Sequence, residues 1–144
     1  MSTCIFCDIL AGIAPAEFVY RDQLCASFMD IRPINPGHVL VVPSAHCALL
    51  TELEETTTRH MLWVAQKVDA ALRKSGLKCE AVNLFLADGR AAGQDVMHVH
   101  LHVIPRFRGD GHHLRFSPAY FSPTQGDQLM MHAELIRKWM EGKV

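Results

Sequence analysis

The segment from His98 to Ile104, with the sequence His-Val-His-Leu-His-Val-Ile, constrains the fold more than any other part of the chain. Polar and apolar residues alternate in it, as they do in a half-buried strand. In a strand the three imidazoles project from one face, roughly 7 Å apart, while Val99, Leu101 and Val103 enter the core. Three polar rings on one sheet face give up the packing that β-branched residues would provide there. The pattern therefore predicts a strand that carries a functional site.

Two kinds of chemistry suit three histidines on one strand, metal binding and covalent catalysis. Zinc accepts imidazole ligands, but His98 and His102 would lie about 13 Å apart in an extended strand and could not bind the same ion. At least one of the three then has another role. An imidazole with an ordinary pKa of about 6.5 is mostly unprotonated at neutral pH, and it is a good nucleophile toward phosphorus. The residues alone leave both possibilities open.

A second set of metal-binding residue types lies outside the triplet. Cys4 and Cys7 form a Cys-x-x-Cys pair, and His38 and His46 flank the apolar run at 39–43. In a reducing compartment such a pair is typical of a metal or redox site. With His46 and one histidine of the triplet, the cysteines would make a Cys₂His₂ set, the type found in closed structural zinc sites. Such a site would join the N-terminal segment to the sheet.

Periodicity and turn residues divide the chain into short elements. A long helix is predicted to begin with a capping box formed by Thr51 and Glu54 and to end at Gly76. The other predicted elements are a helix at 4–12, strands at 17–20, 25–31, 38–43, 81–87 and 97–105, and a terminal helix at about 129–139. The chain between 106 and 128 is expected to be largely irregular.

A loop of small residues, from Gly89 to Asp95, leads into the histidine strand. Loops of this kind bring backbone N–H groups and amide side chains close to phosphate oxygens. Gly93 and Gln94 are the candidates for such a contact.

Length and composition set the outer limits. With 144 residues and 49% hydrophobic content, the chain is expected to form one domain around one core. A net charge of −1 favours neither nucleic acid nor an anionic membrane as a partner, so phosphate binding has to come from a local site. The N-terminus has no basic region, and the apolar runs are too short for a signal segment or a bilayer span. We therefore expect a cytoplasmic protein.

Taken together, these residues resemble the histidine triad (HIT) family, whose signature His-φ-His-φ-His-φ-φ, with φ apolar, is met by residues 98–104. The resemblance extends from about Cys4 to Arg108, so a single HIT domain is expected over 1–144, with its core at about 4–108 and a C-terminal extension at 109–144. The motifs that occur in the family's order are Cys4-Ile5-Phe6-Cys7, Phe28-Met29-Asp30-Ile31, Asn35-Pro36-Gly37-His38, Val41-Val42-Pro43 and Ala92-Gly93-Gln94.

The resemblance implies an α+β meander fold, in which a five-stranded antiparallel sheet with two main helices dimerises into a continuous larger sheet. It points to the zinc-containing, bacterial-type branch of nucleotide hydrolases and transferases. The implied ligands are purine nucleotides such as AMP or GMP derivatives. The implied activity is hydrolysis of nucleoside phosphoramidates or dinucleoside polyphosphates through a covalent nucleotidyl-histidine.

Carried over position by position, the resemblance makes His100 the nucleophile and lets His102 contact the phosphate oxygens. His38 would lie behind His100 and orient it, and Asp30 would bind the ribose hydroxyls. The other implied substrate contacts are Ile5, Phe6, Ile9, Phe28, Ile31, Leu40, Gly93 and Gln94. The implied ligands of a structural zinc ion are Cys4, Cys7, His46 and His98.

One position departs from the family pattern. Many members place Asn or Gln where Ala87 stands and use its amide near the scissile phosphate, a hydrogen bond that alanine cannot make. Loss of one such donor can cost roughly 3 kcal/mol of transition-state stabilisation. Two other hypotheses therefore stay open, a nucleotide-binding regulatory module with little catalytic activity and a metal-dependent hydrolase with the triplet as catalytic ligands.

Overall fold

The computed structural model describes residues 4–140. Residues 1–3, which belong to the N-terminus considered above, and residues 141–144 lie outside the described part. The chain divides into two compact units, one up to Asp110 and one from Gly111 onward. Among residues 4–140, no helix is both long and apolar enough to cross a bilayer. The candidate site lies in the first unit.

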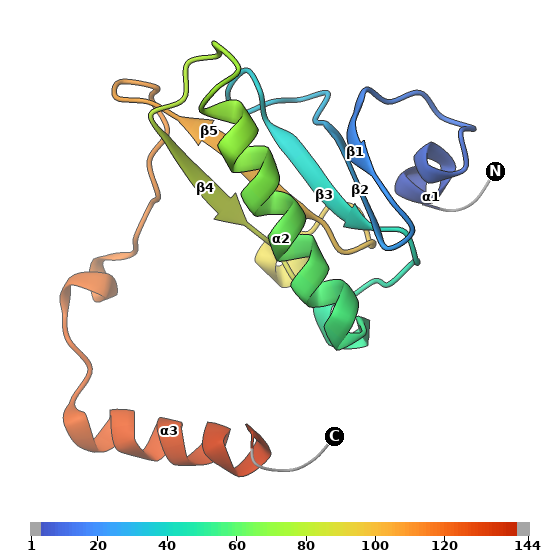
Figure 1. Cartoon of the computed structure of the whole chain (residues 1–144). Helices are drawn as coiled ribbons and strands as arrows, with labels where there is room; N and C mark the ends of the chain where they lie inside the picture. The colour runs from blue at the N-terminus through green and yellow to red at the C-terminus, as the bar shows by residue number, and fades with distance from the viewer. Residues whose placement is uncertain (1–3, 141–144) are drawn as a thin grey trace. The chain divides into compact units, whose positions relative to one another are not determined.

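The first unit is built on a five-stranded sheet in which every neighbouring pair is antiparallel (Figure 1). Its spatial order is β1-β2-β3-β5-β4, so β4 forms one edge and β3 lies in the centre. The strands are β1 (Phe18–Arg21), β2 (Cys25–Met29), β3 (Val39–Pro43), β4 (Ala81–Phe85) and β5 (Leu101–Arg106). The predicted five-stranded antiparallel sheet with two main helices is confirmed.

The two main helices of this unit pack against opposite faces of the sheet. Helix α2 (Glu55–Leu72) buries Met61, Val64 and Val68 against Val39 and Val103. Helix α1 (Ile5–Leu10) contributes to a second core with residues of β2 and β3, namely Phe6, Ile9, Ala26, Phe28, Leu40 and Val42. Because both faces are covered, every residue of β3 is buried, which explains its unbroken apolar sequence.

The histidine segment is only partly in the sheet. The predicted strand at 97–105 begins at Leu101, since the ladder with β3 starts where Leu101 pairs with Val41. Before that point the backbone leaves the ladder, and Val99 N–H donates to the carbonyl of Cys47 at 2.8 Å. His98 and His100 therefore precede β5 and His102 lies in it, although Val99 and Val103 both enter the α2 core as predicted.

The long helix begins later than the capping box predicts. Thr51 lies in a short 3₁₀ turn, Leu50–Glu52, and the N-cap of α2 is Glu54. The carboxylate of Glu52 accepts from the N–H groups of Ala48 and Leu49, so this turn caps itself and separates Thr51 from the helix. At the other end α2 stops at Leu72, and the left-handed Gly76 follows four residues later.

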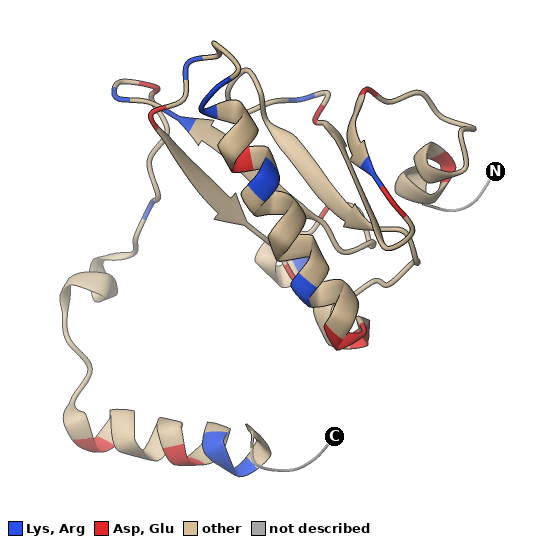
Figure 2. Ribbon diagram, viewed as in Figure 1, with Lys and Arg blue, Asp and Glu red and all other residues tan. Residues whose placement is uncertain are grey.

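The second unit contains a 3₁₀ turn at Pro118–Phe121 and helix α3 (Gly126–Met140), which includes the predicted terminal helix at about 129–139 and begins three residues before it. Leu129, Ile136 and Met140 share one side of α3 and are exposed. Basic and acidic positions are interspersed along α2, whereas on α3 the acidic positions come first and the basic ones lie in the last turn (Figure 2).

Gly37 fixes the loop that delivers His38 to the sheet. Its φ is +95°, and a Cβ atom there would lie 2.9 Å from Leu77 Cδ1 and 3.0 Å from Leu72 Cδ2. Gly37→Ala is expected to lower the free energy of unfolding by about 1–3 kcal/mol, because it adds both backbone strain and overpacking. Gly76→Ala is the control in urea unfolding, since its φ is +82° with open space around it. Equal losses in the two variants would contradict the packing argument.

Candidate active site

A cavity of about 410 Å³ is lined by residues of α1 and of the sheet, and His100 and His102 are part of its wall. Most of its walls are apolar, which is typical of a small-molecule site with a few polar groups placed at one end. Seven of the predicted substrate contacts line it, namely Ile5, Phe6, Ile9, Phe28, Asp30, Ile31 and Leu40, together with His100 and His102. The structure thus brings together the residues that the sequence assigns to one ligand.

His100 is held in one tautomer by the backbone. Its ring nitrogen Nδ1 lies 2.8 Å from the carbonyl oxygen of His98. A carbonyl only accepts, so Nδ1 carries the proton and the neutral ring keeps its lone pair on Nε2. Phe6 packs its edge against the same ring, with the centroids 5.3 Å apart. Nε2 of His100 is therefore the nitrogen available as a nucleophile at the cavity wall.

A second hydrogen-bond chain fixes the tautomer of His102. The N–H of Ile34 donates to Nδ1 of His38 at 3.1 Å, so the proton of neutral His38 is on Nε2. That Nε2 lies 2.9 Å from Nδ1 of His102 and donates to it. His102 then carries its own proton on Nε2, which makes it a hydrogen-bond donor toward a ligand in the cavity. His38 thus orients His102, whereas the carbonyl of His98 orients His100.

Burial keeps His38 and His102 neutral. The pKa of His102 is lowered to about 4, first by desolvation and then by nearby His100 and His38, which disfavour a further positive charge. Burial also lowers the pKa of His38, and the opposing pull of Asp30 is the smaller effect. The 3.7 Å approach of Asp30 to Nδ1 of His38 is therefore a contact with a neutral ring rather than an ion pair.

Asp30 lines the same cavity and directly follows β2. One carboxylate oxygen accepts from the N–H of Arg32 at 2.8 Å, and the other lies 3.7 Å from Nδ1 of His38. A carboxylate held in this way is suited to accept from vicinal hydroxyl groups.

Gln94 does not lie where the sequence argument expects it. Its Oε1 accepts from the N–H of Gly89 at 2.7 Å, and its Nε2 donates to the carbonyl of Ala48 at 2.9 Å. The side chain is buried and is not part of the cavity wall. Gly93 also lies outside the wall and takes the left-handed conformation at the end of the 3₁₀ turn Arg90–Ala92. Both residues shape the loop, and neither contributes a side chain to the cavity.

Four ligand atoms of the predicted metal set lie together. Nδ1 of His98 is 3.3 Å from Nδ1 of His46, 3.5 Å from Sγ of Cys4 and 3.6 Å from Sγ of Cys7. Zn–S and Zn–N bonds of about 2.3 and 2.0 Å place tetrahedral ligand atoms roughly 3.3–3.8 Å apart. Nε2 of His98 donates to the carbonyl of Pro43, so Nδ1 keeps the lone pair that a metal needs. The geometry and the donor set both fit a tetrahedral ion.

Residues 11–109 match the HIT domain family, which is more than half of the chain. The chain belongs to the HIT family. An uncharacterized HIT-like protein of Methanocaldococcus jannaschii is 41% identical over 113 residues, which cover 78% of this chain and 86% of that protein.

Two solved HIT structures resemble the fold closely. A zinc-bound histidine triad family protein of Mycobacterium smegmatis is 42% identical, with a TM-score of 0.74, and the match covers 81% of this chain and 84% of that one. A HIT family member of Bacillus subtilis has a TM-score of 0.88 at 29% identity and covers 99% of this chain and 100% of that one.

Two further HIT relatives carry names that state an activity. An adenosine 5'-monophosphoramidase of Schizosaccharomyces pombe is 36% identical over 104 residues, which cover 72% of this chain and 74% of that one. An adenylylsulfatase of Arabidopsis thaliana is 33% identical over 107 residues, which cover 74% of this chain and 54% of that one. The HIT family thus includes hydrolases that act on adenylyl compounds.

Several residues that line the cavity were not predicted from the sequence. Ala14, Pro15 and Ala16 follow the first helix and line the cavity, as do Arg32 and Asp95. Asp95 directly follows Gln94 in the loop that the sequence singles out, and Asp95 rather than Gln94 lines this cavity.

The burial of His102 predicts a change of stability with pH. Folding lowers the pKa of His102 from 6.5 to about 4, so between these two pH values the unfolded chain binds more protons than the folded chain. The contribution of His102 to the free energy of unfolding is therefore full above pH 6.5 and is lost as the pH falls toward 4. Its neighbours that carry or can take up charge are His38, His100 and Asp30. The partly exposed ring is expected to account for about 1–2 kcal/mol of this loss.

Urea unfolding of the wild type and of His102→Asn between pH 7.5 and 4.5 measures this contribution. Both proteins lose any bound metal over the same range, so the difference between their two curves isolates the imidazole. The wild type is expected to lose more stability than the variant as the pH falls. Parallel curves would contradict the assignment.

Proposed function

We propose that this chain is a nucleotide hydrolase or transferase that acts on purine nucleoside phosphoramidates or dinucleoside polyphosphates through a nucleotidyl-histidine at His100. The observation that carries the proposal is the bond from Nδ1 of His100 to the carbonyl of His98, which leaves Nε2 unprotonated at the cavity wall. The adenylylsulfatase and the adenosine 5'-monophosphoramidase among its HIT relatives support the substrate class.

The cavity suggests how the nucleotide would bind. The base would lie among the apolar side chains of α1, β2 and β3, which include Phe6, Phe28 and Leu40. The free oxygen of Asp30 would accept from the ribose hydroxyls. The phosphate would then lie at the histidine end, where the Nε2–H group of His102 donates to one of its oxygens.

The reaction would proceed in two steps. Nε2 of His100 forms a bond to the phosphorus as the bond to the leaving group breaks, and the leaving atom keeps that electron pair and takes a proton derived from water. The remaining hydroxide then attacks the phosphorus, and Nε2 of His100 leaves with its electron pair. The sum is a nucleoside monophosphate and a free amine or polyphosphate, and His38 and His102 stay neutral throughout.

We also propose that Cys4, Cys7, His46 and His98 hold a structural zinc ion. The Mycobacterium smegmatis relative described as zinc-bound supports this assignment, as does the fit of the four ligand atoms to a tetrahedron. Bound there, zinc would supply a cross-link between α1 and the segment before β5 rather than a reactive water, because all four ligands come from the protein. Of these four residues, His98 is also the one whose carbonyl orients His100.

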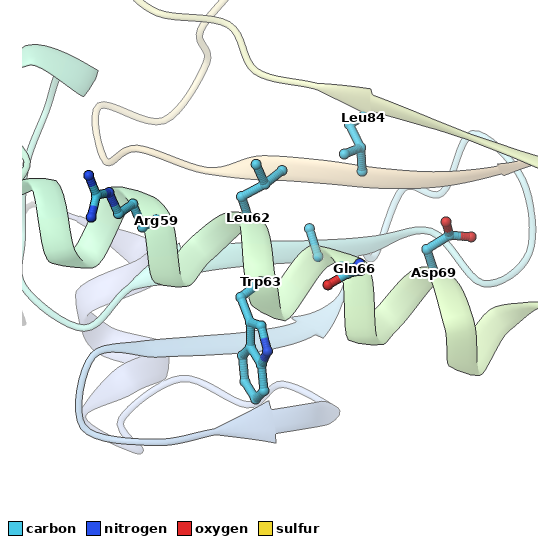
Figure 3. A pocket seen from close by; sticks show the side chains of 7 residues that line it. Arg59, Leu62, Trp63, Gln66, Asp69 and Leu84 are labelled. Atoms are coloured by element: carbon cyan, nitrogen blue, oxygen red, sulfur yellow. The ribbon is translucent and has the colours of Figure 1, made fainter.

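The edge of the sheet supports a homodimer. Strand β4 is exposed along most of its length, with Leu84 and Phe85 about half accessible. Next to it, a groove of about 470 Å³ runs between α2 and β4, lined by Leu62, Trp63 and Leu84 (Figure 3). Pairing of two β4 edges would extend the sheet across both subunits and cover this apolar surface. The cytoplasmic location stays a prediction from the sequence.

A substrate screen tests the function. Adenosine and guanosine 5'-phosphoramidates and dinucleoside polyphosphates are incubated side by side with the protein, and product and zinc content are measured on the same sample. Release of the nucleoside monophosphate from at least one class is the expected result. Tight nucleotide binding without turnover of either class would overturn the enzymatic proposal and favour a binding module, for which Ala87 gives a reason because it supplies no side-chain donor.

A further inference from the structure

The loop between β2 and β3 sets the tautomers of His38 and His102. The N–H of Ile34 donates to Nδ1 of His38 at 3.1 Å, and the N–H of His38 donates to the carbonyl of Asn35, also at 3.1 Å. Ile34 meets the imidazole only while the loop keeps this path. If Ile34 moved away, Nδ1 of His38 could carry the proton instead, and Nε2 would no longer donate to His102. The hydrogen-bond donor that His102 presents to a ligand therefore depends on this loop.

Asn35 fastens the loop to β5 through its side chain. Its Nδ2 donates to the carbonyl of Pro105 and to a carboxylate oxygen of Asp110, each at 2.9 Å. Both partners are acceptors, so the atom that faces them is the amide nitrogen rather than the amide oxygen. Strand β3 begins at Val39, which pairs with Val103, so Pro105 lies beyond the last pair of the β3–β5 ladder. The amide of Asn35 thus joins the loop to β5 at a point that β3 does not reach.

The carboxylate of Asp110 is itself fixed and shielded from water. Arg106 donates to its two oxygens, from Nε at 2.6 Å and from Nη2 at 3.0 Å, and the Asp110 side chain is only 4% exposed. A buried, ion-paired carboxylate keeps its position, because moving it would leave a charge without a partner. Asn35 is buried as well. Loss of either acceptor would leave a buried N–H group unsatisfied, so the amide holds the loop firmly.

We propose that Asn35 is a positioning residue for His38 and His102. Its amide holds the loop against β5, so that the N–H of Ile34 stays on Nδ1 of His38 and His102 keeps the Nε2 proton that would meet the phosphate. The inference rests on the proposed function. It adds to that function a residue that does not line the cavity of the candidate site and acts only through the loop.

Nitrogen NMR of the imidazole rings and steady-state kinetics on an adenosine 5'-phosphoramidate test Asn35→Ala. Protonated and unprotonated ring nitrogens give separate signals, so the spectrum reports the tautomer of each neutral histidine. We expect only the Nε2–H tautomer at His38 and His102 in the wild type, and a mixture of tautomers at both in the variant. The kcat is expected to fall about tenfold, because the donor toward the phosphate is then present only part of the time, and KM should change by less than about threefold.

A double-mutant cycle with His102→Ala separates positioning from a general loss of structure. Once the imidazole of His102 is removed, Asn35→Ala is expected to lower kcat by less than about a further twofold. Asn83→Ala is the matched control, because Asn83 is the other asparagine of the chain and accepts from Arg106 in the same network, but lies on β4. Its kcat and its His38 signals are expected to equal those of the wild type.

A folded Asn35→Ala protein with unchanged tautomers, or losses in Asn35→Ala and His102→Ala that multiply, would overturn the positioning role. If circular dichroism shows that Asn35→Ala is unfolded, the same measurements and outcomes apply to Asn35→Ser, whose hydroxyl keeps one donor for the two acceptors. If the wild type hydrolyses no phosphoramidate, the proposed function fails, whereas the spectra still test whether Asn35 sets the two tautomers.

Discussion

Replacement of His100 by alanine is expected to lower kcat on the best phosphoramidate substrate by about 10⁴-fold or more, because the variant has no atom in place of Nε2 to attack phosphorus. Affinity for the nucleoside monophosphate should change by less than about threefold, since the base and ribose contacts proposed for Phe6, Phe28 and Asp30 remain. Single-turnover kinetics and calorimetric titration with AMP separate the two effects.

His113→Ala controls for the loss of an imidazole as such, because His113 is exposed and belongs to the second unit. Its kcat is expected to match that of the wild type. His102→Asn is informative as well, since an amide in that position can accept from His38 and donate into the cavity, and we expect it to keep more activity than His100→Ala. Turnover near the wild-type rate in His100→Ala would exclude the covalent route.

Removal of the proposed zinc ion is expected to lower the melting temperature by about 10 °C, which corresponds to a loss of roughly 4 kcal/mol. Without the ion, two thiol groups and two imidazoles lose the centre that holds α1 against the segment before β5. Because the carbonyl of His98 orients His100 and α1 supplies Phe6, turnover is expected to fall together with stability. Scanning calorimetry before and after exhaustive chelation measures the change.

Cys4→Ser is expected to reproduce the effect of chelation, whereas Cys79→Ser serves as the control because Cys79 is a free cysteine outside the four-residue cluster. Readdition of zinc should restore the melting temperature of the chelated wild type and leave Cys4→Ser unchanged. Loss of activity with an unchanged melting temperature would contradict a structural role and favour zinc as a catalytic ion.

The sequence predicted the parts of the fold whose local pattern agrees with their packing. Strand β3 has an unbroken apolar sequence because helices cover both of its faces. The alternation at residues 98–104 correctly separated the core residues Val99 and Val103 from the histidines. The four predicted metal-binding residues also lie together in the structure, although Cys4 and His98 are far apart in the sequence.

The sequence could not show which hydrogen-bond partner each backbone N–H or carbonyl group has. His98 and His100 precede the strand because the ladder with β3 ends at the pair Val41 and Leu101 and the N–H of Val99 donates to Cys47 instead, and an alternating pattern does not reveal where a ladder ends. Thr51 lies inside a 3₁₀ turn that the carboxylate of Glu52 caps by accepting from the N–H groups of Ala48 and Leu49, and nothing in the Thr51/Glu54 spacing reveals that turn. Gln94 and Asp95 are adjacent and both polar, and only the bonds of Gln94 to Gly89 and Ala48 show which of them faces the cavity.

The most direct test of the central claim is to capture the intermediate itself. The wild-type protein is mixed with a labelled adenosine phosphoramidate, quenched with alkali within one turnover, and digested for mass spectrometry, because a phosphorus–imidazole bond survives better in base than in acid. The account predicts one adenylyl group per chain, attached to His100. Multiple turnovers without any labelled peptide, or a label on His98 or His102, would contradict it.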